Sequence, residues 1–426
     1  MKKIYALLVA LFLVNGAMAQ WFPQNSGTTK NLNSVYFTDA NTGYAVGDSG
    51  VILETMNGGS NWDLQFSGTT HNLKSIHFPT NQTGYIVGDS STILKTNDYG
   101  TTWNILPNTM QMSWKSVFFT DINTGYAVGL PDVYIPGDSS KIFKTTDGGI
   151  NWNAKSSGTS VQLNAVHFAD SDTGYVVGGY SGPEGYGGPE GYNLSVILKT
   201  TNGGDSWNIQ VYDTGYYALP YHSVFFVNPN IGYVLGTFWW GSVIRKTTDG
   251  GNNWTEGATH PDQPWLISVF ILNADTGFAV GYGIYRTTNG GTDWWAQESS
   301  SFGYPMQSVF FTSDEVGYSV GQPGVILKTT NGGGNPVGIN NQNITASYLT
   351  IYPNPSSATI TIELPDITTP IKNIYLTIYN LNGKQLLRQP IMEPQTVVDI
   401  SGLKAGIYFV KVISDDGVMV GKFLKE

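Results

Sequence analysis

The sequence predicts an all-β protein in which a seven-bladed β-propeller, closed by an N-terminal strand, precedes a small immunoglobulin-like β-sandwich. Two short motifs recur together seven times, the last copy lacks an element that is found near the N-terminus, and about 80 residues at the C-terminus abandon the repeat. The composition agrees, because 52 glycines, 13% aromatic residues and only 12% charged residues suit short, half-buried strands joined by tight turns.

The repeated unit carries one motif for a strand and one for a turn. The first motif is a glycine followed by Tyr or Phe, and its glycines are Gly43, Gly84, Gly125, Gly174, Gly232, Gly277 and Gly317. The second has the form T-x-(D/N)-x-G-x-x-W, and its acidic or amide residues are Asn57, Asp98, Asp147, Asn202, Asp249, Asn289 and Asn331. The copies lie about 40 to 58 residues apart, which is the period expected of propeller blades.

The last copy of the turn motif is incomplete in a way that predicts how the ring closes. Six copies end in a tryptophan, namely Trp62, Trp103, Trp152, Trp207, Trp254 and Trp294. The seventh copy runs from Asn331 to Pro336 without one, while Trp21–Thr29 resembles the Trp62–Thr70 stretch of the first repeat. The N-terminus is therefore expected to complete the last blade, which hides strand edges that would otherwise pair with other chains.

Each repeat is interpreted as four antiparallel strands. In the first repeat we expect strands at 32–37, 43–47 and 51–55 and a fourth that begins at Trp62, because Val, Ile, Tyr and Phe dominate these segments. In the turn before the fourth strand, the Asp or Asn side chain is expected to bond backbone N–H groups two residues on, and the tryptophan to pack back across the hairpin. The turn is thus interpreted as a structural staple and not as a ligand site.

This turn motif resembles the Asp-box, or BNR repeat, of sialidases, of the sortilin ectodomain and of the photosystem II assembly and stability factors. The copy at Thr96–Trp103 matches completely, and the resemblance extends from Trp21 to about Asn335. Combined with the T-G-Y-x-V-G motif, it is most similar to the photosystem II assembly factor propellers. The resemblance implies the architecture and leaves the function open, because one fold serves many functions.

The chain is expected to consist of four segments: a signal peptide at 1–19, the propeller at 20–335, a linker at 336–347 and the sandwich at 348–426. The signal peptide is indicated by two lysines, an apolar run from Ile4 to Val14 and the cleavage site Ala17–Ala19. The run is shorter than the roughly 20 apolar residues that span a membrane, so no transmembrane segment is expected. The absence of cysteine excludes a disulfide framework and a thiolate nucleophile.

The C-terminal domain carries a second set of motifs. Alternating strands separated by Gly and Pro turns predict the sandwich. Its motifs are Y-P-N-P at 352–355, D-I-S-x-L-x-x-G-I-Y-F-V-K-V at 399–412 and K-F-L-K at 422–425. They resemble the type A sorting domain of the Bacteroidetes type IX secretion system. The resemblance implies Sec export, recognition of 348–426 by the type IX translocon and its sorting peptidase, and a secreted or outer-membrane surface protein; an ordinary binding sandwich is the alternative.

One face of the predicted propeller is more elaborate than the other. Because successive strands are antiparallel, the loops between strands two and three (B–C) and between blades (D–A) share one face. The B–C loops are longer in three adjacent blades, at Leu130–Asp138, Gly179–Asn193 and Thr237–Gly241, and the D–A loop Tyr212–Tyr221 opens on the same face. Variable loops on a rigid scaffold are where recognition usually occurs.

These loops supply the candidate ligand-binding residues, all of them aromatic: Tyr186, Tyr192, Tyr216, Tyr217, Tyr221, Phe238, Trp239 and Trp240. Aromatic rings stack on sugars or anchor protein partners, and they are enriched at binding hot spots. The alternative is that these rings only cover their own blades.

The residues needed for several kinds of chemistry are missing. The chain has three arginines, Arg245, Arg286 and Arg388, too few for the arginine triad of a propeller sialidase. A glycan hydrolase needs only two carboxylates about 5 to 10 Å apart. That possibility stays open for the loop carboxylates Asp132, Asp138, Glu184, Glu190 and Asp213.

Metals, cofactors and nucleic acids also lack support in the sequence. His77 and His167 occupy a position that is aromatic in the other repeats, so they are interpreted as packing residues, and no metal-binding or cofactor motif is present. Residues 20–346 hold twelve Lys or Arg against 24 Asp or Glu, which argues against nucleic-acid binding. Six of these twelve cations share one repeat position: Lys95, Lys144, Lys199, Lys246, Arg286 and Lys328.

The sequence therefore predicts a non-catalytic propeller that is secreted or held at the cell surface and binds an unknown protein or polysaccharide through the B–C and D–A loops. Two alternatives are a glycan-active hydrolase or lyase that uses the loop carboxylates, and an assembly factor for a membrane complex.

Overall fold

The computed structural model describes residues 21–132, 140–180, 193–215, 218–238, 241–257, 265–297, 305–333, 349–364, 374–380, 385–414 and 417–426. The chain divides into two compact units, Met1–Val337 and Gly338–Glu426. The described secondary structure is β apart from one 3-10 turn, η1 (Asp48–Gly50). The expected signal peptide at 1–19 and linker at 336–347 lie outside the described residues.

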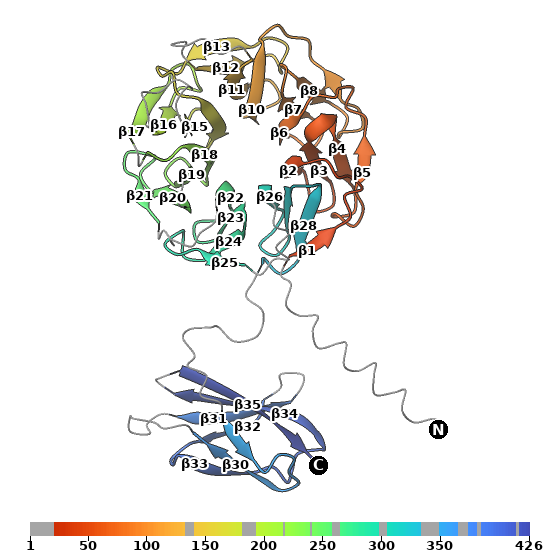
Figure 1. The fold of residues 1–426 in the computed structure, drawn as a ribbon, viewed down its shortest axis with the longest axis vertical. Helices are drawn as coiled ribbons and strands as arrows, with labels where there is room; N and C mark the ends of the chain where they lie inside the picture. The colour runs from red at the N-terminus through yellow and green to blue at the C-terminus, as the bar shows by residue number, and fades with distance from the viewer. Residues whose placement is uncertain are drawn as a thin grey trace, which may run out of the picture. The chain divides into compact units, whose positions relative to one another are not determined.

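Within the described residues of the first unit, seven four-stranded antiparallel sheets are arranged as blades around a common axis (Figure 1). From the innermost strand outward, blade one consists of β2 (Leu32–Phe37), β3 (Gly43–Gly47), β4 (Ile52–Thr55) and β5 (Asp63–Gln65). Blade two consists of β6 (Leu73–His77), β7 (Gly84–Gly88), β8 (Ile93–Thr96) and β9 (Asn104–Ile105). Blade three consists of β10 (Met112–Phe119), β11 (Gly125–Pro131), β12 (Lys141–Thr145) and β13 (Asn153–Ser156). Blade four consists of β14 (Leu163–Phe168), β15 (Gly174–Tyr180), β16 (Asn193–Thr200) and β17 (Asn208–Gly215). Blade five consists of β18 (Tyr221–Phe226), β19 (Gly232–Phe238), β20 (Gly241–Thr247) and β21 (Thr255–Glu256). Blade six consists of β22 (Leu266–Ile271), β23 (Gly277–Gly281), β24 (Ile284–Thr287) and β25 (Trp295–Ala296). Blade seven consists of β26 (Met306–Phe311), β27 (Gly317–Gly321), β28 (Val325–Thr329) and β1 (Phe22–Gln24). The strands expected in the first repeat agree with the observed ones to within a residue.

The N-terminal strand closes the ring, as predicted. Strand β1 pairs antiparallel with β28, with Phe22 opposite Lys328 and Gln24 opposite Ile326. Trp21 is fully buried, and its ring meets Phe311 edge-on at a centroid distance of 5.8 Å. The first and last blades of the chain are thereby joined by backbone pairing and by a buried indole.

The apolar core lies between neighbouring blades. One cluster joins Tyr44 and Ile52 of blade one to Leu73 and Phe78 of blade two, with the rings of Tyr44 and Phe78 stacked at 4.8 Å. Equivalent stacks recur around the ring: Tyr85 on Phe119, Tyr126 on Phe168, Tyr175 on Phe226, Phe278 on Phe311 and Tyr318 on Phe37. Each blade therefore buries its apolar face against the next blade, and a missing blade would expose two such faces.

The repeated turn is organised by its threonine together with its Asp or Asn. In blade one, the Thr55 hydroxyl accepts a hydrogen bond from Gly59 N–H (2.8 Å) and donates to Asn57 Oδ1 (3.1 Å), which accepts from Asn61 N–H (2.9 Å). The hydrogen bond from the backbone N–H four residues later to the side-chain oxygen recurs at Asp98, Asp147, Asn202, Asp249 and Asn289. In the seventh turn, the Thr329 hydroxyl donates to Asn331 Oδ1 (2.9 Å). The expectation of a bond two residues on is therefore wrong, because the threonine hydroxyl takes the nearer amide.

Six of the seven turns are also fastened to the preceding blade by a tyrosine hydroxyl. The Tyr175 hydroxyl and the Lys199 ammonium of blade four both donate to the Gly250 carbonyl in the turn of blade five, at 2.9 and 2.6 Å. We call this arrangement a latch. The same tyrosine–lysine pair recurs at four further turns, where Tyr85 and Lys95 bond Gly148, Tyr233 and Lys246 bond Gly290, Tyr318 and Lys328 bond Gly58, and Tyr126 bonds Gly203 while Lys144 bonds Asp205. The five lysines at the repeat position therefore have structural roles.

Two latches are modified. In blade one the cation is replaced by Glu54, which accepts a hydrogen bond from Tyr44 (3.1 Å), and the Tyr44 hydroxyl also bonds the Tyr99 carbonyl in the next turn. In blade six Phe278 replaces the tyrosine, so no hydroxyl is available for the turn of blade seven. The guanidinium of Arg286 lies over the Phe278 ring at 5.7 Å, and its pKa is lowered by burial.

Aromatic side chains from the seven innermost strands form a continuous belt around the axis. Its members are Tyr36, His77, Phe118, His167, Phe225, Phe270 and Phe310, with neighbouring ring centroids 4.4 to 5.4 Å apart. His77 Nδ1 accepts a hydrogen bond from Phe119 N–H (3.3 Å), so this nitrogen is unprotonated. Burial lowers the pKa of His77 to about 3, with a further contribution from His167, and burial lowers the pKa of His167 to about 4. The two histidines are packing residues, as predicted.

The second unit is a β-sandwich. One sheet consists of β29 (Thr350–Tyr352), β30 (Thr359–Glu363) and β33 (Gln395–Asp399), and the other of β32 (Gln385–Pro390), β31 (Tyr375–Asn380), β34 (Gly406–Ser414) and β35 (Gly417–Lys425). Ile360, Leu376, Val398, Val410 and Phe423 are among the buried residues between the sheets. No helix in the described parts of the chain is long and apolar enough to cross a membrane.

Replacing Trp21 with alanine should lower the free energy of unfolding by about 3 to 5 kcal/mol, because a fully buried indole leaves a cavity in the closing blade. Guanidinium denaturation of the full chain measures this. The matched control is Phe22→Ala in the same strand, where the ring is 43% exposed and should cost less than about 1 kcal/mol. Equal effects of the two substitutions would contradict closure by the N-terminal strand.

The belt histidines should make the fold acid-sensitive between about pH 6.5 and pH 3. In this window the unfolded chain binds protons at His77 and His167 while the folded chain, with pKa values of about 3 and 4, does not, so stability falls as pH falls. In His77→Phe/His167→Phe, which places at both positions the residue found in four other blades, unfolding stability should depend less on pH between 6.5 and 4. An unchanged pH dependence would show that other groups control acid unfolding.

Candidate functional site

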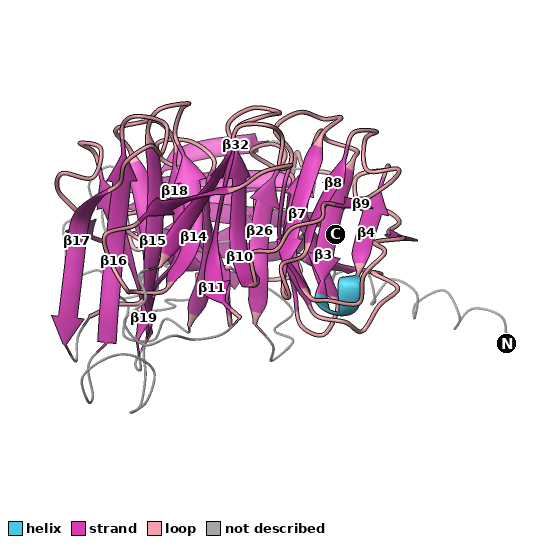
Figure 2. Ribbon diagram, turned by 90° about the horizontal axis from the view of Figure 1, so that it is seen from above, coloured by secondary structure: helices cyan, strands magenta, loops and turns pink. Residues whose placement is uncertain are grey.

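The two faces of the propeller differ in construction. Figure 2 shows η1 and the far ends of β16, β17 and β19 projecting on the same side of the disc. This side carries the B–C and D–A loops, and we call it the loop face. The opposite side carries the A–B and C–D turns, including the latched turns, and we call it the turn face.

The insertion in blade four lengthens the sheet on the loop face. Tyr180 pairs with Leu194 and Asn193 pairs with Gly215, so β15, β16 and β17 continue beyond the level at which blades one, two, six and seven end. Blade five is lengthened in the same way, with Phe238 of β19 opposite Gly241 of β20. The elaborated loops are therefore carried on extended, paired strands.

Most of the candidate aromatic residues lie outside the described residues. These are Tyr186, Tyr192, Tyr216, Tyr217, Trp239 and Trp240. Phe238 is placed as the last residue of β19, and only its backbone is described. Their role in binding remains a prediction.

Tyr221 is a core residue, so the expectation of an exposed loop aromatic is wrong at this position. Its side chain is fully buried, and its hydroxyl accepts a hydrogen bond from Arg245 Nη1 at 2.6 Å. It begins the innermost strand of its blade at the repeat position of Leu32 and Leu73, which are also fully buried. That equivalence was visible in the sequence and would have placed Tyr221 in the core.

Arg245 also accounts for one of the candidate loop carboxylates. Its guanidinium pairs with Asp213 (3.2 Å) and Glu256 (2.9 Å) as well as with Tyr221. Asp132 is exposed at the end of the described part of its loop, whereas Asp138, Glu184 and Glu190 lie outside the described residues. Asp213 is thus held in an ion pair with Arg245.

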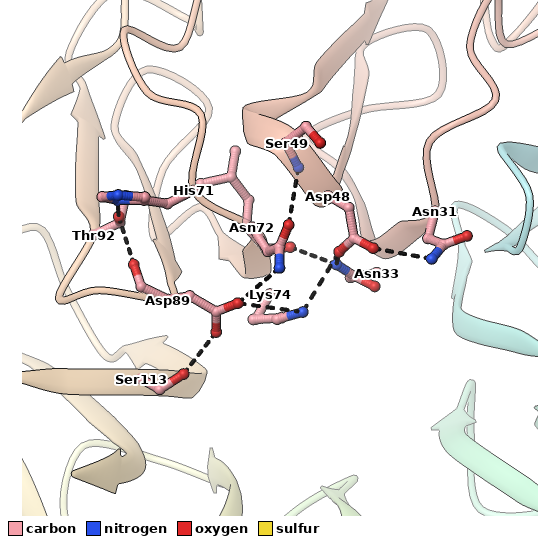
Figure 3. A network of polar contacts seen from close by, with 11 residues as sticks. Asn31, Asn33, Asp48, Ser49, His71, Asn72, Lys74, Asp89, Thr92 and Ser113 are labelled. Atoms are coloured by element: carbon pink, nitrogen blue, oxygen red, sulfur yellow. Dashed lines mark hydrogen bonds and ion pairs between the residues drawn. The ribbon is translucent and has the colours of Figure 1, made fainter. Parts of the chain in front are cut away.

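A polar network on the loop face joins blades one, two and three (Figure 3). Asp48 accepts hydrogen bonds from the side chains of Asn31 and Asn33, both at 2.9 Å. Asp89 accepts from Asn72 (2.9 Å) and from Ser113 (2.6 Å). The two carboxylates occupy equivalent positions, directly after the repeated strand motif, in V-G-D-S sequences at 46–49 and 87–90. The sequence prediction missed this network, although the recurrence of V-G-D-S was a signal for it.

Lys74 links the two carboxylates. Its Nζ lies 3.5 Å from Asp48 Oδ1 and 3.8 Å from Asp89 Oδ2. Burial pushes the pKa of Asp89 upward, but hydrogen bonds from Ser113 and Asn72 and the positive charge of Lys74 outweigh it, so the pKa is lowered. The Asp89 carboxylate is therefore held in its ionised form.

A second lysine at the inner edge of the network has no such partner. Lys115, on β10, forms no ion pair with any described residue of the chain. Burial and the nearby Lys74 lower its pKa, and Asp89 offsets this in part. Burial lowers the pKa of His222, and the positive charge of Lys115 lowers it further. The Nε2 atom of His222 lies 2.7 Å from Thr237 Oγ1. Lys74 and Lys115 thus place two cationic groups on the loop face of an acidic domain.

An open cleft of about 630 Å³ adjoins this network. Apolar side chains form one part of its wall, including Phe66, which is 87% exposed, and Ile105, which is 51% exposed. His71 and Thr92 contribute polar groups, with Nδ1 and Oγ1 3.0 Å apart. The cleft therefore offers both apolar surface and hydrogen-bonding groups on the loop face.

The loops around the cleft hold non-glycine residues in the left-handed region. Ser49, Ser90 and Ser91 have φ values of 59°, 52° and 57°. Ser49 N–H donates to Asn72 Oδ1 (3.0 Å), and Met112 N–H donates to Ser91 Oγ (2.8 Å), so the conformations are fixed by neighbouring loops. Such conformations cost free energy and persist where the surroundings determine them, often at functional sites.

Among the described residues no three His, Asp or Glu side chains are grouped closely enough to hold a metal ion. The network of Figure 3 consists of two carboxylates already paired with Lys74 and with amide donors. The arrangement is suited to binding through hydrogen bonds, charge and apolar contact.

Two family models match separate parts of the sequence. Residues 350–426 match the secretion system C-terminal sorting domain, and residues 14–127 match the photosynthesis system II assembly factor YCF48. No curated protein matches the sequence.

Three solved structures illustrate the similarity of the fold. YCF48 bound to D1 peptide is 17% identical over 74% of this chain and 99% of that chain, with a TM-score of 0.57. A GH74 xyloglucanase from Xanthomonas campestris is 13% identical over 82% of this chain and 60% of that chain, with a TM-score of 0.53. PorZ, an essential surface component of the type IX secretion system of Porphyromonas gingivalis, is 10% identical over 91% of this chain and 58% of that chain, with a TM-score of 0.50.

The strand order, the closing strand and these matches agree with the resemblances in the sequence. The sorting domain indicates export by type IX secretion to the cell surface or beyond. The chain thus combines a photosystem II assembly factor-like propeller with a type IX secretion sorting domain.

Proposed function

We propose that the exported propeller is a non-catalytic binding scaffold that holds a protein or polysaccharide partner on its loop face. The observation that carries this proposal is the contrast between the two faces. On the turn face, the carbonyls of Gly58, Gly148 and Gly250 are already occupied by latches. On the loop face, an open cleft and the unpaired Lys115 remain available to a partner.

The chemistry of the loop face suits a macromolecule better than a small molecule. The cleft is open, and Phe66 stands almost fully exposed at its wall, an arrangement that exposes apolar surface unless a partner covers it. The neighbouring cations and amide groups would bind acidic or carbonyl groups of the same partner. A chain that crosses the face could contact the cleft and the network together.

The candidate aromatic residues in the long loops extend this proposal to the part of the loop face that belongs to blades four and five. Their positions are Tyr186, Tyr192, Tyr216, Tyr217, Phe238, Trp239 and Trp240. The strands that carry these loops are paired to their ends, so the loops begin from rigid positions.

The similar proteins bear on the class of partner. YCF48 was solved with a D1 peptide, and by analogy this favours a peptide segment as the ligand. PorZ is a bacterial surface component, which agrees with action outside the cell. A role in assembling a membrane complex would then concern an outer-membrane assembly, because the sorting domain directs the chain to that side of the cell.

The alternative is a glycan-active enzyme, favoured by the similarity to GH74 folds and by two carboxylates that Lys74 holds near one another. A glycosidase needs one carboxyl group that stays protonated to act as the acid. The pKa of Asp89 is lowered, and its oxygens are engaged by Ser113 and Asn72. The network is therefore better suited to a binding role than to acid catalysis.

Binding of the full chain to an array of 15-residue synthetic peptides and to a panel of defined polysaccharides, xyloglucan included, would test the proposal. Phe66→Ser, Lys115→Gln and a combined Tyr186→Ala/Tyr192→Ala/Trp239→Ala/Trp240→Ala variant should each weaken binding, by about tenfold or more where the side chain is a hot spot. The matched control is Met56→Ser on the turn face, where an apolar side chain is 70% exposed, and it should bind as the parent does.

Equal loss of binding in Met56→Ser, or unchanged binding in all loop-face variants, would contradict a binding site on the loop face. Release of reducing sugars from xyloglucan that is lost in Asp89→Asn would instead support the enzymatic alternative.

A further inference from the structure

We propose that the outer face of the four-stranded sheet of the sorting domain is a docking surface for an acidic, partly apolar surface of the type IX export machinery. This inference concerns the second unit and does not depend on what the propeller binds. It assigns to one face a recognition step that the sorting domain as a whole implies.

The face is defined by alternation along the strands. On β34, Tyr408, Val410 and Val412 are buried between the sheets, so Ile407, Phe409 and Lys411 point outward. On β35, Phe423 is buried, so Lys422 and Leu424 point outward. The alternation of a strand allows no other assignment for these residues.

Strand register brings the outward residues into rows. Ile407 lies opposite Leu424, and Phe409 lies between Tyr379 on one side and Lys422 on the other. These positions form an apolar patch at one end of the sheet. Ile407, Phe409 and Leu424 are 44%, 39% and 41% exposed, so each ring or branched side chain presents a large surface to solvent.

Cations lie beside this patch. Thr377 lies between Arg388 and Lys411, and Lys422 lies in the adjacent row, opposite Phe409. The Arg388 guanidinium lies over the ring of Tyr375 at 4.6 Å, which fixes this charge on the outer face. Among the described residues, neither Arg388, Lys411 nor Lys422 forms an ion pair.

Charge is segregated between the two sheets. The four strands β31, β32, β34 and β35 contain Arg388, Lys411, Lys422 and Lys425 and no Asp or Glu. The three strands β29, β30 and β33 contain Glu363 and Asp399 and no Lys or Arg. Within the strands, one sheet therefore carries only cations and the other only carboxylates.

The occupant follows from this charge pattern and from the match to a sorting domain. A surface that is apolar at one end and cationic beside it is complementary to an acidic surface with an apolar patch. The other sheet presents Glu363 and Asp399 outward, and these carboxylates would repel the same acidic partner. Since residues 350–426 match a domain whose role is sorting by a secretion system, we assign the complementary surface to that machinery.

Secretion of full-length variants from a bacterium with a type IX system tests the assignment. Lys411→Gln/Lys422→Gln removes two positive charges from the proposed face, and Thr359→Glu/Val397→Glu changes the net charge by the same amount on the other sheet. The first variant should reduce the exported fraction by about tenfold, with the protein retained in the periplasm, while the second should be exported normally. The same comparison can be made for exposed apolar residues, with Phe409→Ser on the proposed face and Val397→Ser on the other sheet.

Thermal unfolding of each purified full-length variant shows whether the sandwich remains folded, and only folded variants are compared. Normal export of both Lys411→Gln/Lys422→Gln and Phe409→Ser would overturn the proposal. Loss of export in Thr359→Glu/Val397→Glu to the same extent would overturn it as well, because the effect would not be specific to one sheet. Since neither pair alters the propeller, either result leaves the proposal for the loop face unaffected.

Discussion

The propeller depends on one repeated interaction, in which a tyrosine hydroxyl and a lysine ammonium of one blade donate to a carbonyl in the turn of the next. At Gly250 these bonds are 2.9 and 2.6 Å long, and the tyrosine ring that carries the hydroxyl is itself stacked on the core of the next blade. A buried carbonyl without such donors would cost free energy, and apolar packing alone does not fix where one blade lies along the next. The latch thus couples burial between blades to a defined register.

This constraint determines which face is left for function. Each latched turn needs its threonine, its Asp or Asn and a residue with positive φ, so the turn face tolerates little variation. The loops at the opposite ends of the strands carry no such requirement and differ in length and composition. The extended strands of blades four and five, the cleft near Phe66 and the network around Lys74 all lie there. A rigid ring in which one face repeats the same turn from blade to blade and the other face varies is suited to presenting a binding surface.

Much of this architecture could be predicted from the sequence because it repeats. Seven copies of two motifs fixed the blade number, and the tryptophan missing after Asn331 pointed to Trp21 as the closing residue. The strand limits were predictable because glycine and the turn motif mark both ends of each hairpin. The sandwich was predictable from its alternating strands and its sorting motifs.

The remaining features depend on contacts that the local pattern does not encode. Tyr221 was predicted on a loop because an insertion precedes it, yet it occupies the buried first position of an inner strand. The reach of the Asp or Asn side chain was underestimated because the threonine hydroxyl competes for the nearest amide. The network of Asp48, Lys74 and Asp89 joins residues from different blades, so no single repeat contains it. The charge segregation of the sandwich becomes visible only when the strands are sorted into sheets.

The most direct test of this account is the unfolding free energy of Tyr175→Phe/Lys199→Met, measured by guanidinium denaturation beside the two single variants. The double variant removes both donors to the Gly250 carbonyl and keeps the aromatic ring and most of the lysine stem. The double variant should lose about 2 to 3 kcal/mol of unfolding free energy, more than either single variant, because a buried carbonyl is left without a donor. The control Tyr212→Phe removes a hydroxyl from a side chain that is 48% exposed and should change little. A double variant as stable as the parent would contradict the claim that latches hold the ring together.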